Sequence, residues 1–327
     1  MKSVFAPHLD RHVRFGRRKP VVVPRHLKLA NYLRRVELPP VPASADWVPA
    51  AQSVVSNVYL NDQLGDCGIA GGYHIVGVET GNAGNLFTAS DAQIVADYSA
   101  IGGYVVGNES TDNGIFLTDA LKYWTSHGFA NGTKLTAWIS VDTTNTAEVQ
   151  AALWLFENLY LGLELPDSYV NPFPSGSGFT WDTGAPDPSN GHCIVGAGYD
   201  DKGIKVLTWG LTGTLTYAAA AALCVGKVGG EAYVLLTPDQ LAKSASKAPN
   251  GVAWNDLIVD FDALGGNVPI PAPPPPTPPP PTPGAGPTLA QAVGWVTTGL
   301  STHPPLLRRS DAIVAASKAL TDHWPKA

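Results

Sequence analysis

The order in which helix and strand patterns follow one another constrains the fold of this chain most strongly. Helix patterns come first, at residues 67–77, 90–98, 118–126 and 146–156, with Ser90 as a candidate N-cap and Gly128 as a stop. Strand patterns follow, separated by glycine-bearing turns, at residues 159–165, 193–197, 204–209, 213–217 and 232–236. Helices first and strands later predict an α+β fold, in which a helical half packs against an antiparallel β half across a cleft.

A polar, glycine-bearing turn at residues 61–66 leads directly into the first of these helices, which begins at Cys67. A helix N-terminus carries partial positive charge and free N–H groups, and both lower the pKa of a thiol placed there. Cys67 is therefore a candidate nucleophile. The alternative, a buried cysteine that only packs, stays open at this point because free cysteines are common in protein cores.

A histidine from the second half of the chain would complete a nucleophilic pair, and His192 stands at the start of an apolar strand pattern. Its alternative is an ordinary loop histidine. His74 is a poor partner for Cys67, because seven helical residues place it about two turns, roughly 10 Å, away. We expect it to pack or cap. Cys193 follows His192 on the same strand, so its side chain should point to the opposite face, into the core.

The charge of the chain is divided unevenly between its N-terminal segment and the rest. Residues 1–36 hold ten of the 21 Lys and Arg residues and a single acid, Asp10, within a chain whose net charge is −6. Prolines and the lack of periodicity predict an extended arm over residues 1–45. A basic arm could bind nucleic acid, or it could lie on an acidic surface of its own body or of a protein partner. Its aliphatic residues favour the second interpretation.

Composition excludes several classes of protein. Three scattered cysteines (Cys67, Cys193 and Cys224) form neither a disulfide framework nor a zinc motif, so no metal or other cofactor is expected. With 44% hydrophobic and 15% charged residues, the 327-residue chain reads as a soluble globular protein. Charge follows the first residues instead of an apolar run, so no signal peptide is expected, and no apolar run is long enough to span a bilayer. A cytoplasmic location follows.

The C-terminal part divides into three segments. Residues 254–264 suit a helix that closes the main domain, which we place at residues 46–266. Residues 267–287 form a proline-rich linker, since residues 269–287 alone contain 12 of the 29 prolines. The tail, residues 288–327, contains two short amphipathic helix patterns at 288–300 and 310–324. Forty residues are marginal as an independent fold, so we expect the tail to dock on a partner or to self-associate, either as a homo-oligomer or in a larger assembly.

Residues 46–237 resemble the papain-like cysteine peptidases in the order of their motifs. The matching pieces are Asp46-Trp47, Asp66-Cys67-Gly68, Glu79-Thr80-Gly81-Asn82, Asp112-Asn113-Gly114, Gly191-His192-Cys193, Thr208-Trp209-Gly210 and Glu231-Ala232-Tyr233-Val234. The resemblance implies a two-lobed papain-like fold, with Cys67 on the nucleophile helix and His192 on the histidine strand. The chain is also similar to uncharacterised papain-like proteins with a Gly-Asp-Cys motif that bacteria and their phages encode. A phage origin would imply a place in the virion.

The chain departs from the family pattern at three places. The family's local pattern Cys-Gly-Ser-Cys-Trp, whose second cysteine is the nucleophile, is absent. If Cys67 matched the first cysteine of that pattern, Ala70 would stand at the nucleophile's position. The short distance from Cys67 to the helix end at residues 80–82 favours Cys67 itself as the nucleophile. The family's oxyanion glutamine lies six residues before the nucleophile, where this chain has Asn61. Gln63 lies four residues before Cys67, and because it is a glutamine we favour it slightly over Asn61 as the oxyanion donor. Leu207 takes the place of the family's orienting asparagine, and the candidates to substitute for it are Thr208 and Asp200.

The resemblance implies a thiol hydrolase that cleaves a peptide or related amide bond through a Cys67–His192 dyad. Trp209 would shield His192 from water, and the alternative is a tryptophan that only packs in the core. Gly65, Asp66 and Gly191 would line the substrate site. The substrate would be a peptide or protein, without a nucleic-acid or membrane partner. The rival interpretation is a papain-like fold kept as a structural or assembly protein, for example in a virion, since the arm, linker and tail suit assembly and the asparagine is missing.

Overall fold

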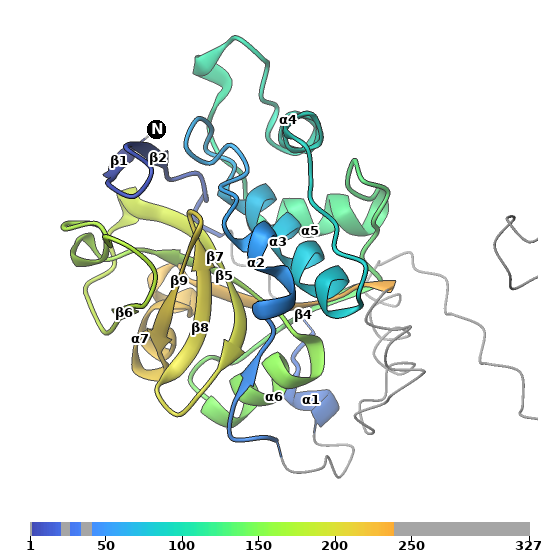
Figure 1. The fold of residues 1–327 in the computed structure, drawn as a ribbon, viewed down its shortest axis with the longest axis vertical. Helices are drawn as coiled ribbons and strands as arrows, with labels where there is room; N and C mark the ends of the chain where they lie inside the picture. Colours follow the sequence, from blue (N-terminus) through green and yellow to red (C-terminus); the bar gives the residue numbers. More distant parts are fainter. Residues whose placement is uncertain (1, 21–26, 34–40, 239–327) are drawn as a thin grey trace, which may run out of the picture. The chain divides into compact units, whose positions relative to one another are not determined.

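The computed structural model describes residues 2–20, 27–33 and 41–238 (Figure 1). These residues belong to one compact unit, and a second unit at residues 271–327 lies outside the described part. The expected closing helix at 254–264, the proline-rich linker at 267–287 and the tail at 288–327 therefore also lie outside the described residues. Within the described residues, no helix is both long enough and apolar enough to cross a membrane.

The helices expected from the sequence are present, and local signals explain their ends. Helix α4 begins with a capping box, in which Ser90 and Gln93 exchange side-chain and backbone hydrogen bonds, and ends at Gly103 in the left-handed conformation. Asn145 caps α6. The helices are α1 (Ala30–Leu33), α2 (Gln52–Val55), α3 (Cys67–Asn82), α4 (Asp91–Gly102), α5 (Leu117–Ser126), α6 (Thr146–Phe156) and α7 (Tyr217–Leu223).

The strands of the second half form most of one eight-stranded sheet. Its order is β4-β10-β5-β7-β8-β9-β6, with the short strand β3 also paired to β7. All neighbours are antiparallel except β6 and β9. The strands are β3 (Ala45–Asp46), β4 (Ala137–Ser140), β5 (Leu159–Glu164), β6 (Phe179–Trp181), β7 (Gly191–Tyr199), β8 (Gly203–Thr208), β9 (Leu211–Thr216) and β10 (Glu231–Leu236).

The sheet separates two hydrophobic cores. One core joins the sheet to helices α2 to α5, and the other joins it to α6, α7 and the N-terminal residues. Strand β7 shows the alternation that this requires: Cys193 and Val195 belong to the core with α3, whereas Ile194 belongs to the other. The expectation that Cys193 is a core residue is thus confirmed. Helix α3 packs directly on β7, which brings the start of the helix to the start of the strand (Figure 1).

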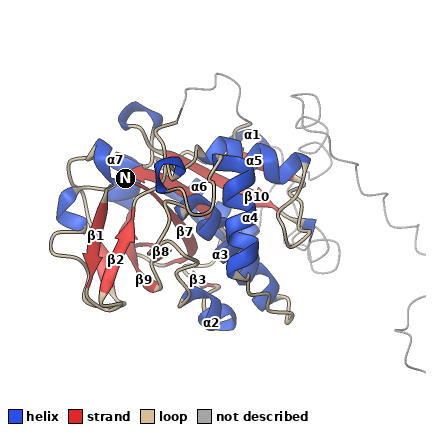
Figure 2. Cartoon of the chain, turned by 90° about the horizontal axis from the view of Figure 1, so that it is seen from above, coloured by secondary structure: helices blue, strands red, loops and turns tan. Residues whose placement is uncertain are grey.

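Three elements differ from the sequence-based expectations. Helix α3 runs beyond the pattern at 67–77 to Asn82, where the resemblance of residues 79–82 to the end of the family's helix places its end. The strand expected at 213–217 is β9, which ends at Thr216 and is followed by the unexpected helix α7. The extended arm is wrong in part, because strands β1 (Ser3–Ala6) and β2 (Arg11–Arg14) form an antiparallel hairpin. Figure 2 shows this hairpin on the side of the molecule where β9 lies. Its apolar residues Ala6 and Val13 are fully buried, which fixes the arm to the body.

Candidate active site

Cys67 is the first residue of α3 and is buried. The preceding residue, Asp66, is buried as well, and burial raises the pKa of its carboxyl well above its usual range. The Asp66 carboxylate accepts a hydrogen bond from the Asn61 side chain at 3.2 Å, and the same amide nitrogen donates to the backbone oxygen of Leu64 at 3.1 Å. These bonds fix the turn that delivers Cys67 to the start of the helix.

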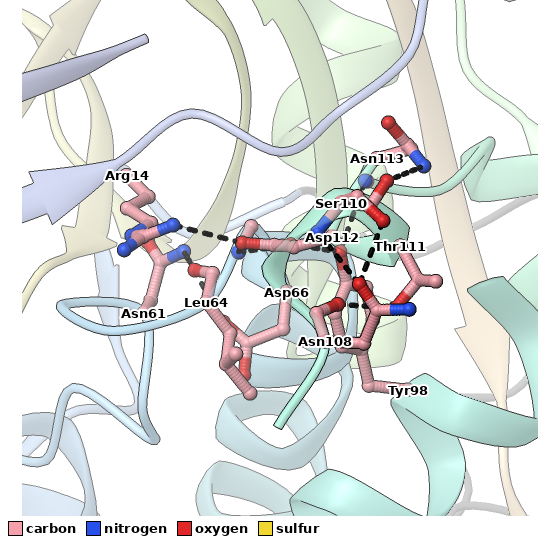
Figure 3. Close-up of polar contacts among 12 residues, drawn as sticks. Arg14, Asn61, Leu64, Asp66, Tyr98, Asn108, Ser110, Thr111, Asp112 and Asn113 are labelled. Atoms are coloured by element: carbon pink, nitrogen blue, oxygen red, sulfur yellow. Dashed lines mark hydrogen bonds and ion pairs between the residues drawn. The ribbon is translucent and has the colours of Figure 1, made fainter. Parts of the chain in front are cut away.

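Asp112 holds this turn from the helical side. Its carboxylate accepts hydrogen bonds from the Gly65 backbone N–H at 3.0 Å and from the Tyr98 hydroxyl at 2.5 Å, and it pairs with Arg14 at 3.0 Å. Figure 3 shows the Asp112 carboxylate reached by Arg14 from one side and by the Tyr98 side chain from another. One buried carboxylate therefore joins the arm, the turn before Cys67 and helix α4.

His192 lies near the start of β7, next to the end of β8. The Thr208 hydroxyl is 2.8 Å from the Nε2 atom of His192. The Nδ1 atom is buried and has no hydrogen-bond partner among the residues that the structure describes. Of the two substitutes considered for the orienting residue, Thr208 is therefore the one in contact with the ring, whereas the Asp200 carboxylate accepts from the backbone of Lys202 and Gly203. Leu207 is buried in the core with α3.

Trp209 covers the His192 ring. The two rings stack with centroids 3.9 Å apart and an angle of 16° between their planes. Trp209 and Gly210 form the two-residue turn between β8 and β9, and both have positive φ values, 48° and 77°. Two positive φ values are typical of a tight hairpin turn, and they are unusual for tryptophan. The turn thus accepts local strain at the residue that covers the histidine.

The structure brings most of the predicted site residues to one small cavity. Cys67, His192, Asn61, Thr208 and Trp209 all line it, and its volume is about 10 Å³. Gln63 is exposed and is not among the lining residues, although its residue type favoured it as the oxyanion donor. The expected lining residues Gly65, Asp66 and Gly191 do not line this cavity, since Gly65 and Asp66 lie in the turn before Cys67 and Gly191 precedes His192 on β7. His74 also lines the cavity and packs against Tyr59, with its Nε2 atom 2.9 Å from the Asn57 oxygen.

Residues 14–18 of the arm pass between three parts of the body: the turn before Cys67, the segment before α5 and the start of β7. The sequence did not predict this path. The backbone N–H of Arg14 donates to the Asn61 oxygen at 2.8 Å, and that of Arg17 donates to the Gly191 oxygen at 3.1 Å. Ile115 donates to the Gly16 oxygen at 2.9 Å and accepts from the Arg18 N–H at 2.8 Å. The bridge between Arg17 and Ile115 is parallel. We call residues 14–18 the crossing segment.

Gly16 is the point of closest approach within the crossing segment. A Cβ atom at this position would lie 1.8 Å from the Gly65 oxygen, and a Cβ atom at Gly114 would lie 1.9 Å from the Gly16 oxygen. Only glycine lets backbones pack so closely. Phe15 is buried beside Gly16, and its ring lies edge-on to His192 at 6.1 Å and to Trp209 at 5.7 Å between centroids. The crossing segment thus covers the histidine side of the cavity.

Burial under the crossing segment keeps both candidate reactive groups neutral. Burial raises the pKa of the Cys67 thiol to about 12, although the backbone amides of Cys193 and Gly16 lower it in part. Burial, with a smaller contribution from the charge of Arg17, lowers the pKa of His192 to about 3. Gly16 itself packs against the backbone of Gly65, two residues before Cys67. In this closed form the thiol and the imidazole are both uncharged at neutral pH.

The basic arm lies on acids of its own body, as one of the two interpretations of its charge expects. Arg14 pairs with Asp112, Arg17 with Glu231 at 2.8 Å, and Arg11 with Asp62 at 2.8 Å. Among the described residues, no group of three or more His, Cys, Asp or Glu side chains is arranged to hold a metal ion. The site therefore consists of a thiol, an imidazole, a hydroxyl and an amide, arranged under a covering segment.

Comparison with solved structures identifies the fold. No protein-family model matches the chain, and no curated protein matches it. The structure is similar to xylellain, a cysteine protease from Xylella fastidiosa, with a TM-score of 0.52 and 15% identity over 72% of this chain and 98% of that one. Weaker similarity extends to procathepsin B S9 from Trypanosoma congolense, with a TM-score of 0.47 and 11% identity over 69% of this chain and 86% of that one. It also extends to procathepsin L 3 from Tenebrio molitor, with a TM-score of 0.45 and 16% identity over 63% of this chain and 77% of that one. The chain has a papain-like α+β fold.

Proposed function

We propose that this protein is a latent papain-like thiol hydrolase that cleaves a peptide or related amide bond through Cys67 and His192. One observation carries the proposal: Thr208 engages one nitrogen of the His192 ring, while the other nitrogen has no partner and the ring shares a cavity with the Cys67 side chain. A histidine fixed at one nitrogen and free at the other is arranged to exchange a proton with a nearby thiol.

The reaction would follow the balanced course of acyl transfer to a thiol. The Cys67 proton moves to the free Nδ1 atom of His192, and the thiolate attacks the carbonyl carbon. The C–N bond breaks, and the amine leaves with the proton from His192. Water then adds to the thioester while His192 accepts one of its protons, and the acid product leaves as the thiol is restored. Thr208 would hold the ring in position throughout, in the role of a positioning residue.

The developing oxyanion needs hydrogen-bond donors beside the sulfur. The Cys67 backbone N–H at the start of α3 supplies one, because the first N–H groups of a helix have no partner within the helix. Asn61 is the better candidate for the second donor than Gln63, because Asn61 lines the cavity with Cys67 whereas Gln63 is exposed. Its amide now donates to Leu64 and Asp66, so it would reorient when substrate enters.

The protein would be latent in the form seen here, because the crossing segment leaves no room for a substrate. The cavity of about 10 Å³ beside Cys67 and His192 is about the size that one water molecule needs. Displacement of the segment would admit water and remove the burial that holds both groups neutral. The pKa of Cys67 would then fall and that of His192 would rise, which favours transfer of the thiol proton to the imidazole.

The direction of the crossing segment explains why Cys67 would not cut its own arm. His192 returns its proton to the leaving nitrogen, so the leaving half of a substrate lies beside this ring. Phe15 lies edge-on to His192 and takes that place, so we assign Arg17, on the other side of Gly16, to the acyl side. In a cleavable peptide the acyl half lies on the N-terminal side of the scissile bond. Here the residue assigned to the acyl side, Arg17, lies on the C-terminal side of Gly16. The segment therefore passes the sulfur in the reverse direction.

The test uses the full-length chain with Gly16→Ala, since a Cβ atom there cannot coexist with the Gly65 oxygen and must displace the segment. Gly176→Ala is the matched control, because a Cβ atom there meets nothing within 4 Å. We expect Gly16→Ala to hydrolyse fluorescently labelled casein and to label at Cys67 with an epoxysuccinyl probe, and Gly176→Ala to behave like the parent. Adding Cys67→Ala or His192→Ala to Gly16→Ala should abolish hydrolysis.

Absence of hydrolysis in Gly16→Ala, together with labelling of Cys67 no faster than of Cys193 and Cys224, would contradict the proposal. The second candidate would then apply, a papain-like fold that serves as a structural or assembly protein such as a virion component. The closed cavity, with both groups neutral, is the observation that favours it. A defined oligomer in light scattering, combined with an inert Cys67 in every variant, would support this second candidate.

A further inference from the structure

Arg17 is a long cationic side chain that is completely buried. Its exposed side-chain fraction is 0%, and its guanidinium contacts one carboxylate: Nε donates to the Glu231 Oε1 atom at 2.9 Å, and Nη2 lies 2.8 Å from the same oxygen. Nη2 also donates to the Gly229 backbone oxygen at 2.5 Å. Burying a charge is costly unless it is paired and hydrogen-bonded, and this pocket bonds two of the three guanidinium nitrogens, whereas Nη1 is buried and has no hydrogen-bond partner among the described residues.

The pocket has room for this side chain because one of its walls is a glycine. In the sheet, Gly162 of β5 is directly opposite Glu231 of β10. A Cβ atom on Gly162 would lie 2.3 Å from the Arg17 Nε atom and 2.8 Å from a Leu117 methyl group. Any larger residue at position 162 would fill the pocket. Gly162 and Glu231 therefore form a slot with an apolar wall from α5 and an acidic end.

The acidic end of the slot requires a cation. Glu231 is buried, and the Tyr233 hydroxyl donates to its second oxygen, Oε2, at 3.0 Å. Burial raises the pKa of Glu231, and the charge of Arg17 acts in the opposite direction and helps to keep the carboxylate ionised. A second buried acid, Glu164 of β5, pairs with the arm as well: its Oε1 atom lies 3.5 Å from the Lys19 Nζ atom. Once the arm leaves, two buried carboxylates lose their cations.

The slot lies next to the proposed reaction centre. Arg17 donates its N–H to the oxygen of Gly191, the residue before His192, and the residue before Arg17 is Gly16, which packs against the Gly65 backbone two residues before Cys67. We assign the leaving side to Phe15, which packs on His192, and the acyl side to Arg17, on the other side of Gly16. A substrate whose acyl half occupies the same place would direct a side chain into this slot from the first or second residue before the scissile bond.

We propose that the slot formed by Glu231, Gly162 and Gly229 is a specificity pocket for an arginine side chain on the acyl side of the scissile bond, and that Arg17 occupies it in the latent form in place of substrate. Glu231 is the specificity-determining residue. The inference rests on the proposed hydrolase function and names its substrate class. Release of the arm thus does two things at once: it uncovers Cys67, and it frees an acidic pocket that selects arginine peptides.

A binding experiment tests the pocket without catalysis. Full-length Arg17→Ala empties the slot while the rest of the chain is kept, and the probes are N-acetyl-arginine amide and its uncharged isostere N-acetyl-citrulline amide. We expect the arginine probe to raise the melting temperature of Arg17→Ala and the citrulline probe to leave it unchanged. Neither probe should act on Arg17→Ala/Glu231→Gln or on the parent protein, whose slot is filled. Equal effects of both probes on Arg17→Ala would overturn the proposal.

A kinetic experiment that keeps Arg17 in the chain tests the specificity itself. Gly16→Ala is assayed with matched fluorogenic peptides that carry arginine or citrulline at the first or second position before the scissile bond. We expect kcat/KM to be about 10- to 100-fold higher for arginine at one of these positions, as for a hydrogen bond to a charged partner. The ratio should fall close to one in Gly16→Ala/Glu231→Gln.

The two proposals fail in distinguishable ways. If Gly16→Ala cleaves arginine and citrulline peptides at equal rates, the hydrolase stands and the arginine pocket is wrong. If Gly16→Ala cleaves no peptide and Cys67 stays inert to the epoxysuccinyl probe, the hydrolase itself is wrong, and the substrate role of the pocket falls with it. The binding result then tells whether Glu231 still selects a guanidinium group.

Discussion

The hydroxyl oxygen of Thr208 lies 2.8 Å from the Nε2 atom of His192, across the pair of antiparallel strands β7 and β8. A threonine thus occupies the position from which a side chain can fix the tilt of the histidine ring. A hydroxyl can donate or accept, so it can follow the ring as its protonation changes, and it does so without adding a buried charge. The site is therefore consistent with a dyad that is oriented by a neutral group.

We predict that Thr208→Val in the Gly16→Ala background lowers kcat by about 10- to 100-fold, since the hydrogen bond to the protonated ring is lost. Thr208→Ser should restore most of the rate because it keeps the hydroxyl. Thr214→Val, a β-branched change on the neighbouring strand β9, is the control and should leave kcat as it is. An unchanged kcat in Thr208→Val, whatever happens to KM, would show that Thr208 does not position His192.

The reactivity of the Cys67 thiol should report whether the site is closed. Its pKa of about 12 in the closed form means that, near pH 8, only roughly one molecule in ten thousand carries the thiolate. Iodoacetamide labelling of Cys67 in the parent should therefore keep rising with pH up to pH 10. In Gly16→Ala we expect a plateau at lower pH, where the thiolate is already formed. Cys193 and Cys224 serve as internal controls, and a parent that labels rapidly at pH 7 would refute the closed form.

Acid should loosen the crossing segment through His192. The pKa of this ring is about 3 in the closed form, below the ordinary value of 6.5, so the closed form binds fewer protons than an open form with a hydrated ring. The closed form is therefore fully favoured above pH 6.5 and loses stability as the pH falls from 6.5 toward 3. At pH 5 the loss is about 2 kcal/mol for an open ring with the ordinary pKa.

Hydrogen exchange at the Arg14, Arg17 and Arg18 amides measures this opening, after correction for the intrinsic exchange rate. We expect protection of these amides to fall by about 30-fold between pH 7 and pH 5. The pH dependence should disappear in His192→Asn and persist in His12→Asn, a change on the exposed part of strand β2. Equal protection at both pH values in the parent would exclude His192 as the acid-sensitive group.

Asp112 should couple the arm to the turn that carries Cys67. Asp112→Asn removes the charge that Arg14 and the Gly65 N–H share and weakens the bond from Tyr98. We predict a loss of about 1–3 kcal/mol in the free energy of unfolding, with increased exchange confined to the turn and the crossing segment. Asp119→Asn, on the exposed face of α5 beside Lys122, should cost less than about 1 kcal/mol. Urea unfolding and hydrogen exchange of the two variants would decide.

The parts of the fold that the sequence predicts are those with local causes. The Ser90 cap, the Asn145 cap and the alternation along β7 act over a few residues, so helices α4 to α6 and the histidine strand are readable from the chain alone. Helix α7 has a signal that could have been used, because Tyr217–Leu223 contains five consecutive alanines, the residue with the highest helix propensity. The strand pattern just before it obscured this signal.

The covering of the site by the crossing segment could not be predicted from the sequence, because it depends on contacts between residues far apart in the chain. Strands β1 and β2 are only four residues long each, and a two-stranded hairpin of this length needs packing on the body to be stable. Gly16 has no local role that would mark it. Its function becomes clear only when Gly65 and Gly114 approach it from other segments. The same holds for Thr208, whose contact with His192 arises from strand register.

The crossing segment belongs to the same polypeptide as the site it fills, and this sets how the protein would respond to its surroundings. A covalently attached occupant has a local concentration that does not change when the sample is diluted. The resting state should thus be the same at nanomolar and micromolar protein. A single backbone cut between Arg18 and Trp47 would change this, since the freed piece could diffuse away, and activity would then depend on how much protein is present.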